Sequence, residues 1–362
     1  MHTLAELLAT DDVAGALEDL GVDPDGAVVE PVGYPFGSPA TAALYRVRSN
    51  GRSFFVKALQ HVKHWPALAF MPPHIVDDFV AQFPWRSELD LWEPWEVATM
   101  PAGLRPPVLH RLVEMPDERA SVWMEDVVEC AEGWDLDRYR RAAYLLGRWN
   151  ARSTDPDLLA RCPHTERNFA LRMYATNAVA FRGLVPLGND ELWTHPWLTD
   201  HAELRADLLA LAPDIPAMLD RMDTYVQCVP HGDASPQNLL VPADDPETFV
   251  VIDISFRTPH ALGFDLGQLL VGLTHAGDVP AARLPEVAAT IVSAYLEGLH
   301  DEGVVDQDAQ ARDAFATGVM LRSGFDGFLY ELLEESDPAQ RHAFDERVEM
   351  SRMLVDLYRS TR

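Results

Sequence analysis

The chain has 362 residues, of which 48% are hydrophobic and 24% are charged, as is typical of a globular protein with room for two lobes. Its formal net charge of −28 argues against nucleic acid and membrane partners and favours a cationic small molecule, unless the acids only solvate the surface. We expect a cytoplasmic protein, because no long apolar run predicts a membrane helix, the N-terminus lacks a basic signal-peptide start, and the three cysteines are widely spaced.

The N-terminal third of the chain is predicted to be mostly sheet after one short helix. Leucines and alanines recur at helical spacing over residues 4–20. Residues 43–48 and 52–57 have the composition of strands and flank Asn50-Gly51, a dipeptide typical of a tight hairpin turn. Residues 33–39, rich in glycine and proline, are predicted to form a loop that leads into this hairpin.

The next part of the chain is predicted to alternate irregular, helical and extended segments. Prolines and aromatic residues over 60–84 indicate irregular structure, and residues 85–93 are predicted to form a helix. Strands are expected at 108–113 and 121–127. Long helices follow, beginning with residues 135–151, whose apolar side chains recur on one face.

The order of sheet followed by helix predicts an α+β fold with two lobes. We place a nucleotide-binding lobe at residues 1–124, a hinge at 125–130 and a helical lobe at 131–362. The helical lobe also contains a loop at 231–238 and a strand-like apolar run at 249–252.

The loop at residues 231–238 is the most informative segment, because it carries side chains of a specific chemistry. It consists of His-Gly-Asp-Ala-Ser-Pro-Gln-Asn, and Asp253 follows the apolar run at 249–252. Phosphoryl transfer requires a carboxylate that orients a hydroxyl and oxygen ligands that hold magnesium. A polar turn capped by Asp or Asn is the alternative for the loop alone, but it does not account for Asp253.

This loop and Ile252-Asp253 resemble the catalytic loop and metal-binding strand end of the aminoglycoside phosphotransferase family. Asp265 in the sequence GFDLGQLL matches a further aspartate of many relatives. The resemblance covers residues 20–350 and implies a bilobal protein-kinase-like fold, with an antiparallel sheet lobe carrying one main helix and a larger helical C-terminal lobe. It also implies a kinase that moves the γ-phosphate of ATP, with Mg²⁺, to a hydroxyl of a small molecule.

The resemblance assigns a role to each matched residue of the loop and strand. Asp233 would accept or orient the proton of the acceptor hydroxyl. Asn238 and Asp253 would bind Mg²⁺. His231 and Asp265 would support the loop, Asp265 by accepting hydrogen bonds from its backbone N–H groups.

Lys57 is one of only two lysines, with Lys63, among 29 basic residues, which suggests that a compact ammonium is needed there. The resemblance implies that Lys57 contacts the α- and β-phosphates and pairs with a helix glutamate. Glu88 is the better placed partner, and Glu93 is the second choice. Ser38 is expected to cap the β-phosphate, although a simple turn before a strand is the alternative.

Two further pairs of residues complete the predicted site. Backbone groups of Glu125 and Val127, at the hinge, are expected to pair with the adenine edge. Asp326 and Glu331 lie in an acidic and aromatic segment at 325–335. They are candidates for binding a cationic acceptor, and an amphipathic helix with a solvated face is the alternative.

The sequence leaves the acceptor and the oligomeric state open. Aminoglycosides and other antibiotics, amino sugars, and choline- or homoserine-type alcohols all fit, in antibiotic resistance or in metabolism, and in a monomer or a homodimer. A catalytically inactive nucleotide-binding module is an alternative from another class, but Lys57, Asp233, Asn238 and Asp253 are all intact. A protein kinase is disfavoured because its glycine-rich G-x-G-x-x-G loop is absent.

Overall fold

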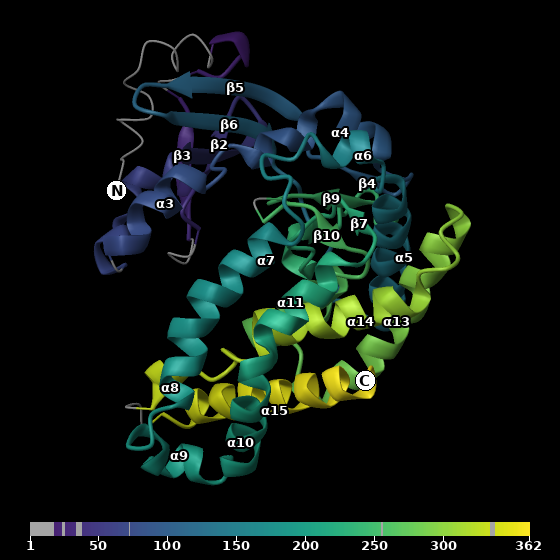
Figure 1. Ribbon diagram of the computed structural model, residues 1–362. Coiled ribbons are helices and arrows are strands. Elements are labelled where there is room, and N and C mark those ends of the chain that lie inside the picture. Colours follow the sequence, from purple (N-terminus) through teal and green to yellow (C-terminus); the bar gives the residue numbers. More distant parts are fainter. Residues whose placement is uncertain (1–17, 24–25, 34–37, 72, 255, 334–336) are drawn as a thin grey trace. The chain divides into compact units, whose positions relative to one another are not determined.

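The computed structural model describes residues 18–362 apart from 24–25, 34–37, 72, 255 and 334–336 (Figure 1). The chain divides into two compact units. Unit 1 comprises Met1–Ala98, Arg105–Ala131 and Leu240–Ser255, and unit 2 comprises Thr99–Leu104, Glu132–Leu239 and Phe256–Arg362. The domain limits expected from the sequence remain a prediction, and most of the predicted helix at 4–20 lies outside the described residues.

Unit 1 contains a five-stranded antiparallel sheet in the order β1-β2-β3-β6-β5. Its strands are β1 (Val28–Val32), β2 (Thr41–Ser49), β3 (Arg52–Gln60), β5 (Leu109–Met115) and β6 (Arg119–Glu125). A second sheet has the order β4-β9-β8, formed by Leu104–Arg105, Phe249–Val251 and Leu239–Leu240. Asn50 and Gly51 have positive φ angles of 51° and 74°, so a two-residue turn joins β2 to β3. The predicted hairpin is therefore confirmed.

Successive side chains of β3 point to opposite faces of the sheet, as the pleat of a strand requires. Phe54, Val56 and Ala58 belong to one buried cluster, which includes Trp123 of β6. Leu59 and the half-buried Phe55 belong to a second cluster on the other face. Lys57 lies between Phe55 and Leu59 in this alternation, so β3 directs it to the face of the second cluster.

The structure corrects the prediction for residues 60–93. The supposedly irregular stretch contains helix α3 (Pro73–Gln82), because proline is tolerated at the first position of a helix. The predicted helix at 85–93 is a 3₁₀-helix over Ser87–Trp92, followed by α4 (Pro94–Thr99). Glu93 has an extended backbone, because a residue that precedes proline is disfavoured in the helical region.

Unit 2 is mainly helical. Its helices before the 231–238 loop are α5 (Leu136–Arg152), α6 (Pro156–Leu159), α7 (Phe169–Tyr174), α8 (Val185–Leu187), α9 (Pro196–Thr199), α10 (Ala202–Leu211) and α11 (Ile215–Asp223). Those after it are α12 (Leu266–Ala276), α13 (Leu284–Asp301), α14 (Asp308–Val319) and α15 (Pro338–Ser360). Strands β7 (Gln227–Cys228) and β10 (His260–Ala261) form a small antiparallel sheet. Within the described ranges, every helix is too short or too polar to span a bilayer.

Helices α5 and α13 pack along one another at unusually close range (Figure 1). A Cβ atom on Gly147 of α5 would lie 2.2 Å from the carbonyl oxygen of Tyr295, and one on Gly298 of α13 would lie 2.2 Å from that of Tyr144. Backbone therefore touches backbone at two neighbouring points of the contact. Only glycine fits these two positions without moving a helix.

Replacing Gly147 by alanine should force α5 and α13 apart and lower the free energy of unfolding by about 1–3 kcal/mol. Gly133→Ala is the matched control, because a Cβ atom at Gly133 meets nothing within 4 Å. Urea unfolding followed by circular dichroism measures both variants. Equal midpoints for Gly147→Ala and the wild type would show that the contact is looser than the structure indicates.

Candidate active site

In unit 1, Lys57 forms a buried ion pair with Glu88. The Lys57 Nζ atom lies 2.5 Å from Glu88 Oε2, and the two side chains are only 8% and 6% exposed. β3 and the 3₁₀-helix over Ser87–Trp92 supply the two partners. The expected partner of Lys57 is therefore in contact with it, although it lies on a 3₁₀-helix rather than an α-helix.

Burial raises the pKa of Glu88 above its ordinary value, and the negative charge of Asp253 acts in the same direction. Lys57 opposes both effects through its charge and its hydrogen bond. A lysine held in a low-dielectric pocket between acids cannot be replaced freely by another base. The pair positions one ammonium group with little freedom to move.

Asp253 lies within reach of the same ammonium group. Its Oδ1 atom is 3.5 Å from Lys57 Nζ, and its side chain is 25% exposed. The backbone of Asp253 has a φ of 56°, which is uncommon for a residue other than glycine. Such conformations concentrate at functional sites, where surrounding structure maintains them. Unit 1 thus gathers Lys57, Glu88 and Asp253 into one cluster.

The other residues predicted for nucleotide binding lie in less distinctive surroundings. Ser38 is half-buried, and its Oγ accepts a hydrogen bond of 3.3 Å from Thr41, while residues 34–37 of the same loop lie outside the description. Glu125 ends β6, and its N–H donates to Val108 O at 2.9 Å, so this N–H is unavailable to adenine. Val127 is half-buried just beyond the strand. Their roles remain predictions.

The Glu125 side chain is held in an ion pair. Its carboxylate accepts two hydrogen bonds from the guanidinium of Arg105, at 2.6 and 2.8 Å, and a third from Val108 N. The hydrogen bonds from Arg105 hold the pKa of Glu125 below its ordinary value. The carboxylate therefore supports the backbone at this place and is not itself a contact for adenine.

In unit 2, a buried carboxylate fixes the start of the 231–238 loop. Asp265 accepts hydrogen bonds from His231 N at 3.1 Å and Gly232 N at 2.8 Å. It also accepts one from Asn150 Nδ2 at 3.1 Å. His231 is buried, and its Nδ1 accepts a hydrogen bond from Asp233 N at 3.2 Å. Both side chains thus accept hydrogen bonds from the backbone of the loop.

Asp233 and Asn238 are joined directly. Asn238 Nδ2 donates to the backbone oxygen of Asp233 at 2.8 Å and to its Oδ2 at 3.2 Å. The amide nitrogen is therefore engaged, which leaves Asn238 Oδ1 as the atom suited to a cation. The Asp233 side chain is 28% exposed, so the solvent reaches the carboxylate.

Arg322 also contacts the loop, although it is not among the residues predicted for the site. Its Nη2 donates to Asp233 Oδ1 and its Nη1 to Gly232 O, each at 2.8 Å. Arg322 lies in a π-helical segment, Met320–Gly324, that continues α14. A charged residue directly after the apolar run Val319-Met320-Leu321 is the one signal in the sequence, and its partner Asp233 lies 89 positions earlier in the chain.

Asp326 and Glu331, the predicted substrate acids, occupy different environments. Asp326 Oδ2 accepts hydrogen bonds from Tyr174 at 2.9 Å and Arg182 at 2.8 Å, and its side chain is only 7% exposed. Its charge is therefore already compensated. Glu331 is exposed in a short 3₁₀-turn over Tyr330–Leu332. The alternative of an amphipathic helix at 325–335 is wrong, because the described residues form a loop and this single turn.

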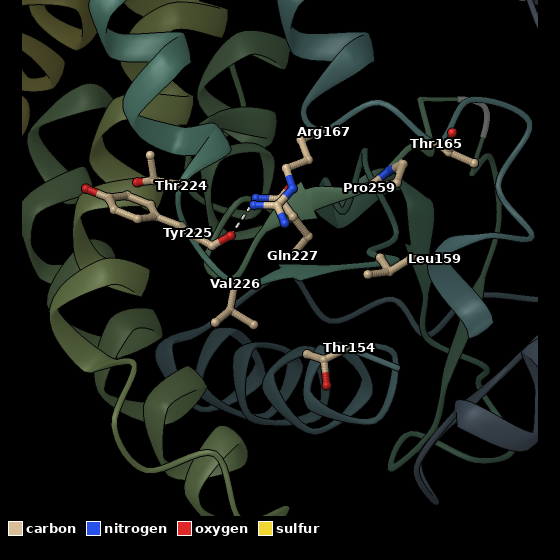
Figure 2. A pocket seen from close by; sticks show the side chains of 9 residues that line it. All are labelled: Thr154, Leu159, Thr165, Arg167, Thr224, Tyr225, Val226, Gln227 and Pro259. Carbon is tan, nitrogen blue, oxygen red and sulfur yellow. Dashed lines mark hydrogen bonds between the residues drawn. The ribbon is translucent and has the colours of Figure 1, made fainter. Parts of the chain in front are cut away.

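A cavity of about 350 Å³ lies elsewhere in unit 2 (Figure 2). Its lining comes from α6, β7 and the segments that precede or follow α5, α7, α11 and β10, namely Thr154, Leu159, Thr165, Arg167, Thr224, Tyr225, Val226, Gln227 and Pro259. One wall is fixed internally, since Gln227 Nε2 donates to Tyr225 O at 3.0 Å. The residues predicted for the site do not line it, so the cavity is not part of the candidate active site.

Carboxylate and amide oxygens are the protein ligands that Mg²⁺ accepts. Among the described residues there is no group of three or more His, Cys, Asp or Glu side chains arranged for a metal. Mg²⁺ in nucleotide sites usually takes only one or two protein oxygens and completes its octahedron with water and phosphate. Asn238 Oδ1 in unit 2 and the Asp253 carboxylate in unit 1 are oxygen donors of this kind.

The chain is similar to known proteins in its structure but not in its sequence. The chain matches no model of a protein family and no curated protein. Solved structures are similar to it in fold, and three of them follow. The GDP and kanamycin complex of APH(2")-IIia is 16% identical, with a TM-score of 0.55, covering 96% of this chain and 99% of that one.

The other two structures are named as kinases. Amicoumacin kinase hAmiN, in complex with AMP-PNP, Ca²⁺ and Ami, is 14% identical with a TM-score of 0.54 and covers 99% of this chain and 96% of that one. The microcompartment-associated aminopropanol kinase is 16% identical with a TM-score of 0.52, covering 96% and 98%. Identities this low establish a shared fold. They confirm the predicted α+β protein-kinase-like fold.

A buried histidine in an aromatic stack, His260, is expected to make the stability of unit 2 depend on pH. The His260 ring lies 3.8 Å from Phe264, nearly parallel to it, and Phe256 lies parallel to both. Burial, with help from the charge of Arg322, lowers the pKa of His260 from 6.5 to about 3. Between pH 6.5 and about 3, His260 is therefore neutral in the folded protein, whereas it binds a proton in the unfolded chain.

Stability due to neutral His260 should be present above pH 6.5 and decline as the pH falls towards about 3. At pH 5 the loss amounts to about 2 kcal/mol relative to pH 7.5. His260→Gln, which cannot take up this proton, should lose less stability over the same interval. Urea midpoints at the two pH values test this, and equal pH dependence in both proteins would exclude His260 as a source.

Proposed function

We propose that this chain transfers the γ-phosphoryl group of a Mg²⁺-bound nucleoside triphosphate to a hydroxyl group of a small molecule. The observation that carries the proposal is the geometry of the 231–238 loop. Asp265 holds its backbone, Asp233 presents a partly exposed carboxylate, and the Asn238 amide is turned so that its oxygen is left for a cation. This combination suits a reaction that depends on positioning and charge stabilisation.

In the proposed reaction, Asp233 accepts the hydrogen bond of the acceptor hydroxyl and aims its oxygen at the γ-phosphorus. The new bond joins that oxygen to phosphorus, and the bond between the γ-phosphorus and the β,γ-bridging oxygen breaks. The hydroxyl proton passes to the Asp233 carboxylate and then to solvent, while the nucleoside diphosphate leaves. The exposed fraction of Asp233 permits both the approach of a hydroxyl and the loss of the proton.

Lys57 provides the fixed positive charge for the nucleotide phosphates. Glu88 holds its ammonium group at 2.5 Å, so little side-chain entropy is lost when a phosphate binds. Asn238 and Asp253 are the residues that would hold Mg²⁺, which supplies neutralisation of charge on the phosphate oxygens. Ser38 and the backbone of Glu125 and Val127 would contribute to nucleotide binding from unit 1.

We propose ATP as the phosphoryl donor, with GTP as the second choice, because the similar structures contain AMP-PNP in one case and GDP in another. For the acceptor we propose a small hydroxylated amine. The names of the similar proteins, with kanamycin and aminopropanol among them, and the net charge of −28 support this class. Exposed Glu331 remains a candidate contact, whereas Asp326 is already paired.

An inactive nucleotide-binding module is the alternative function. Loss of a metal ligand or of the phosphate-binding lysine is the change expected of such a module. Here Lys57 retains its glutamate, and Asp233 and Asn238 retain their mutual contact. These observations favour a catalyst.

The proposal is tested by measuring consumption of ATP and GTP, with Mg²⁺, across a panel of amino sugars, aminoglycosides and other antibiotics, and small amino alcohols. Turnover that requires one class of acceptor is the expected result. Tight nucleotide binding without turnover on any acceptor would instead favour the inactive module.

Asp233→Asn should lower kcat by about 10²–10⁴-fold, because an amide cannot take the proton, while nucleotide affinity stays within a few-fold of the wild type. Asp190→Asn is the matched control, since Asp190 also pairs with an arginine, at 2.7 Å, but is 94% exposed. Steady-state kinetics with the acceptor found in the panel measure both variants. Near wild-type turnover in Asp233→Asn would contradict the assigned role.

Lys57→Arg should weaken nucleotide binding and lower kcat/KM by about tenfold or more, because the larger guanidinium does not fit a site built for an ammonium. Lys63→Arg is the matched control, since Lys63 is more exposed and pairs with Asp117 and Glu118. Isothermal calorimetry with the nucleotide and Mg²⁺ compares the two. Equal affinities in both variants would show that Lys57 is incidental to the nucleotide.

A further inference from the structure

The Asp233 carboxylate accepts a different donor on each of its oxygens. Oδ1 accepts from Arg322 Nη2 at 2.8 Å, and Oδ2 accepts from Asn238 Nδ2 at 3.2 Å. The terminal torsion of an aspartate is intrinsically broad, so an unsupported carboxylate would sample a wide range of rotations. Two donors from different segments of the chain remove that freedom. Each oxygen still has a lone pair for a further hydrogen bond.

Arg322 also holds the backbone that carries this carboxylate. Its second nitrogen, Nη1, donates to Gly232 O at 2.8 Å, while Gly232 N donates to Asp265. Gly232 is therefore hydrogen-bonded through both its N–H and its carbonyl oxygen. Its φ of +85° and the 2.7 Å approach of a hypothetical Cβ to Phe256 O leave room for glycine alone.

The contacts require a planar guanidinium rather than any positive charge. One fork spans a backbone oxygen and a carboxylate oxygen at equal distances, and the same group lies over the Phe256 ring at 4.1 Å from its centroid. A lysine offers a single ammonium and cannot reproduce the fork. The Arg322 side chain is only 13% exposed, so its position is well constrained.

The local fold aims Arg322 at the loop. α14 widens into a π-helical turn over Met320–Gly324, and π-turns are rare and frequent at functional sites. The Phe256 ring beneath the guanidinium lies parallel to the rings of His260 and Phe264. The π-helical turn that carries Arg322 and the aromatic stack that contacts its guanidinium thus restrict the Arg322 side chain to one position.

We propose that Arg322 is a positioning residue for phosphoryl transfer, which orients the Asp233 carboxylate towards the acceptor hydroxyl. This inference rests on the proposed function of Asp233. Arg322 acts through Asp233 and is not assigned a contact with the acceptor or the nucleotide. Its guanidinium also offsets the negative charge of Asp233, which otherwise repels the phosphoryl group that must approach it.

Arg205 offers an internal control with the same set of interactions. It donates to a backbone oxygen, Leu187 O, at 2.8 Å, to a carboxylate, Asp190, at 2.7 Å, and lies over the Trp193 ring at 5.0 Å. Its side chain is 18% exposed. Removing Arg205 therefore removes a comparable amount of structure from unit 2 without touching Asp233.

The test compares Arg322→Ala, Arg205→Ala and Asp233→Asn in the full-length protein, with the acceptor from the panel and with water as the acceptor. Arg322→Ala should lose about 100-fold in kcat, with KM for the nucleotide and the acceptor changed only a few-fold. Millimolar guanidinium chloride should restore at least a tenth of the lost kcat to Arg322→Ala, while equimolar sodium chloride restores none. Arg205→Ala should keep wild-type kcat and show no response to guanidinium.

Arg322→Lys keeps the charge and provides a second test if the alanine variant does not fold. It should retain less than about a tenth of kcat, because the ammonium cannot hold both oxygens. Wild-type kcat in Arg322→Ala or Arg322→Lys, or an equal loss in Arg205→Ala, would overturn the positioning role. Loss of kcat without rescue by guanidinium would also overturn it.

The two proposals fail in different ways. If Asp233→Asn is inactive and Arg322→Ala is fully active, the positioning role is wrong and the proposed function stands. If Asp233→Asn turns over at the wild-type rate, or the wild-type protein shows no turnover with any acceptor, the proposed function itself fails.

Discussion

The carboxylate of Asp265 is the constraint on which the candidate active site depends. It is 1% exposed, and polar oxygens so deeply buried require hydrogen-bond donors. The nearest suitable donors are the N–H groups of His231 and Gly232, together with Asn150, which is itself in contact with Tyr295 OH at 3.1 Å. Satisfying these buried oxygens therefore fixes the backbone immediately before Asp233. That backbone places Asp233 where its carboxylate accepts the hydrogen bonds of Asn238 and Arg322, which orient it.

Unit 1 applies the same physical rule to a positive charge. Lys57 is almost fully buried in a chain that is strongly acidic overall, and it is stable there because Glu88 lies at 2.5 Å and Asp253 at 3.5 Å. The raised pKa of Glu88 shows that burial outweighs the attraction of Lys57 for its carboxylate. A phosphate group that binds Lys57 would meet an ammonium already held in place. Each unit thus contributes charged groups whose positions were determined by folding rather than by a ligand.

Local chemistry was predictable from the sequence, and distant pairing was not. Asn50-Gly51 specifies a hairpin by itself, and the spacing within residues 231–238 specifies a loop that can hold both a carboxylate and an amide. Glu88 is predictable because a buried Lys57 needs an acidic partner. The 3₁₀-helix that carries Glu88 and the neighbouring α3 are not, because they depend on where Pro73 and Pro94 begin new helices. Arg322 and the neutralisation of Asp326 by Arg182 involve partners 89 and 144 residues away, which no local pattern encodes. The acceptor is unpredictable for the same reason.

The central claim is that a hydroxyl oxygen of a small molecule, and not water alone, receives the γ-phosphoryl group. Phosphorus NMR of the protein with Mg²⁺, the nucleoside triphosphate and a hydroxylated amine tests this most directly, because it identifies the phosphorylated product. The account predicts that the γ-phosphorus signal disappears as the signal of a phosphate monoester of the acceptor grows. Formation of inorganic phosphate only, or an unchanged triphosphate with every acceptor, would contradict it.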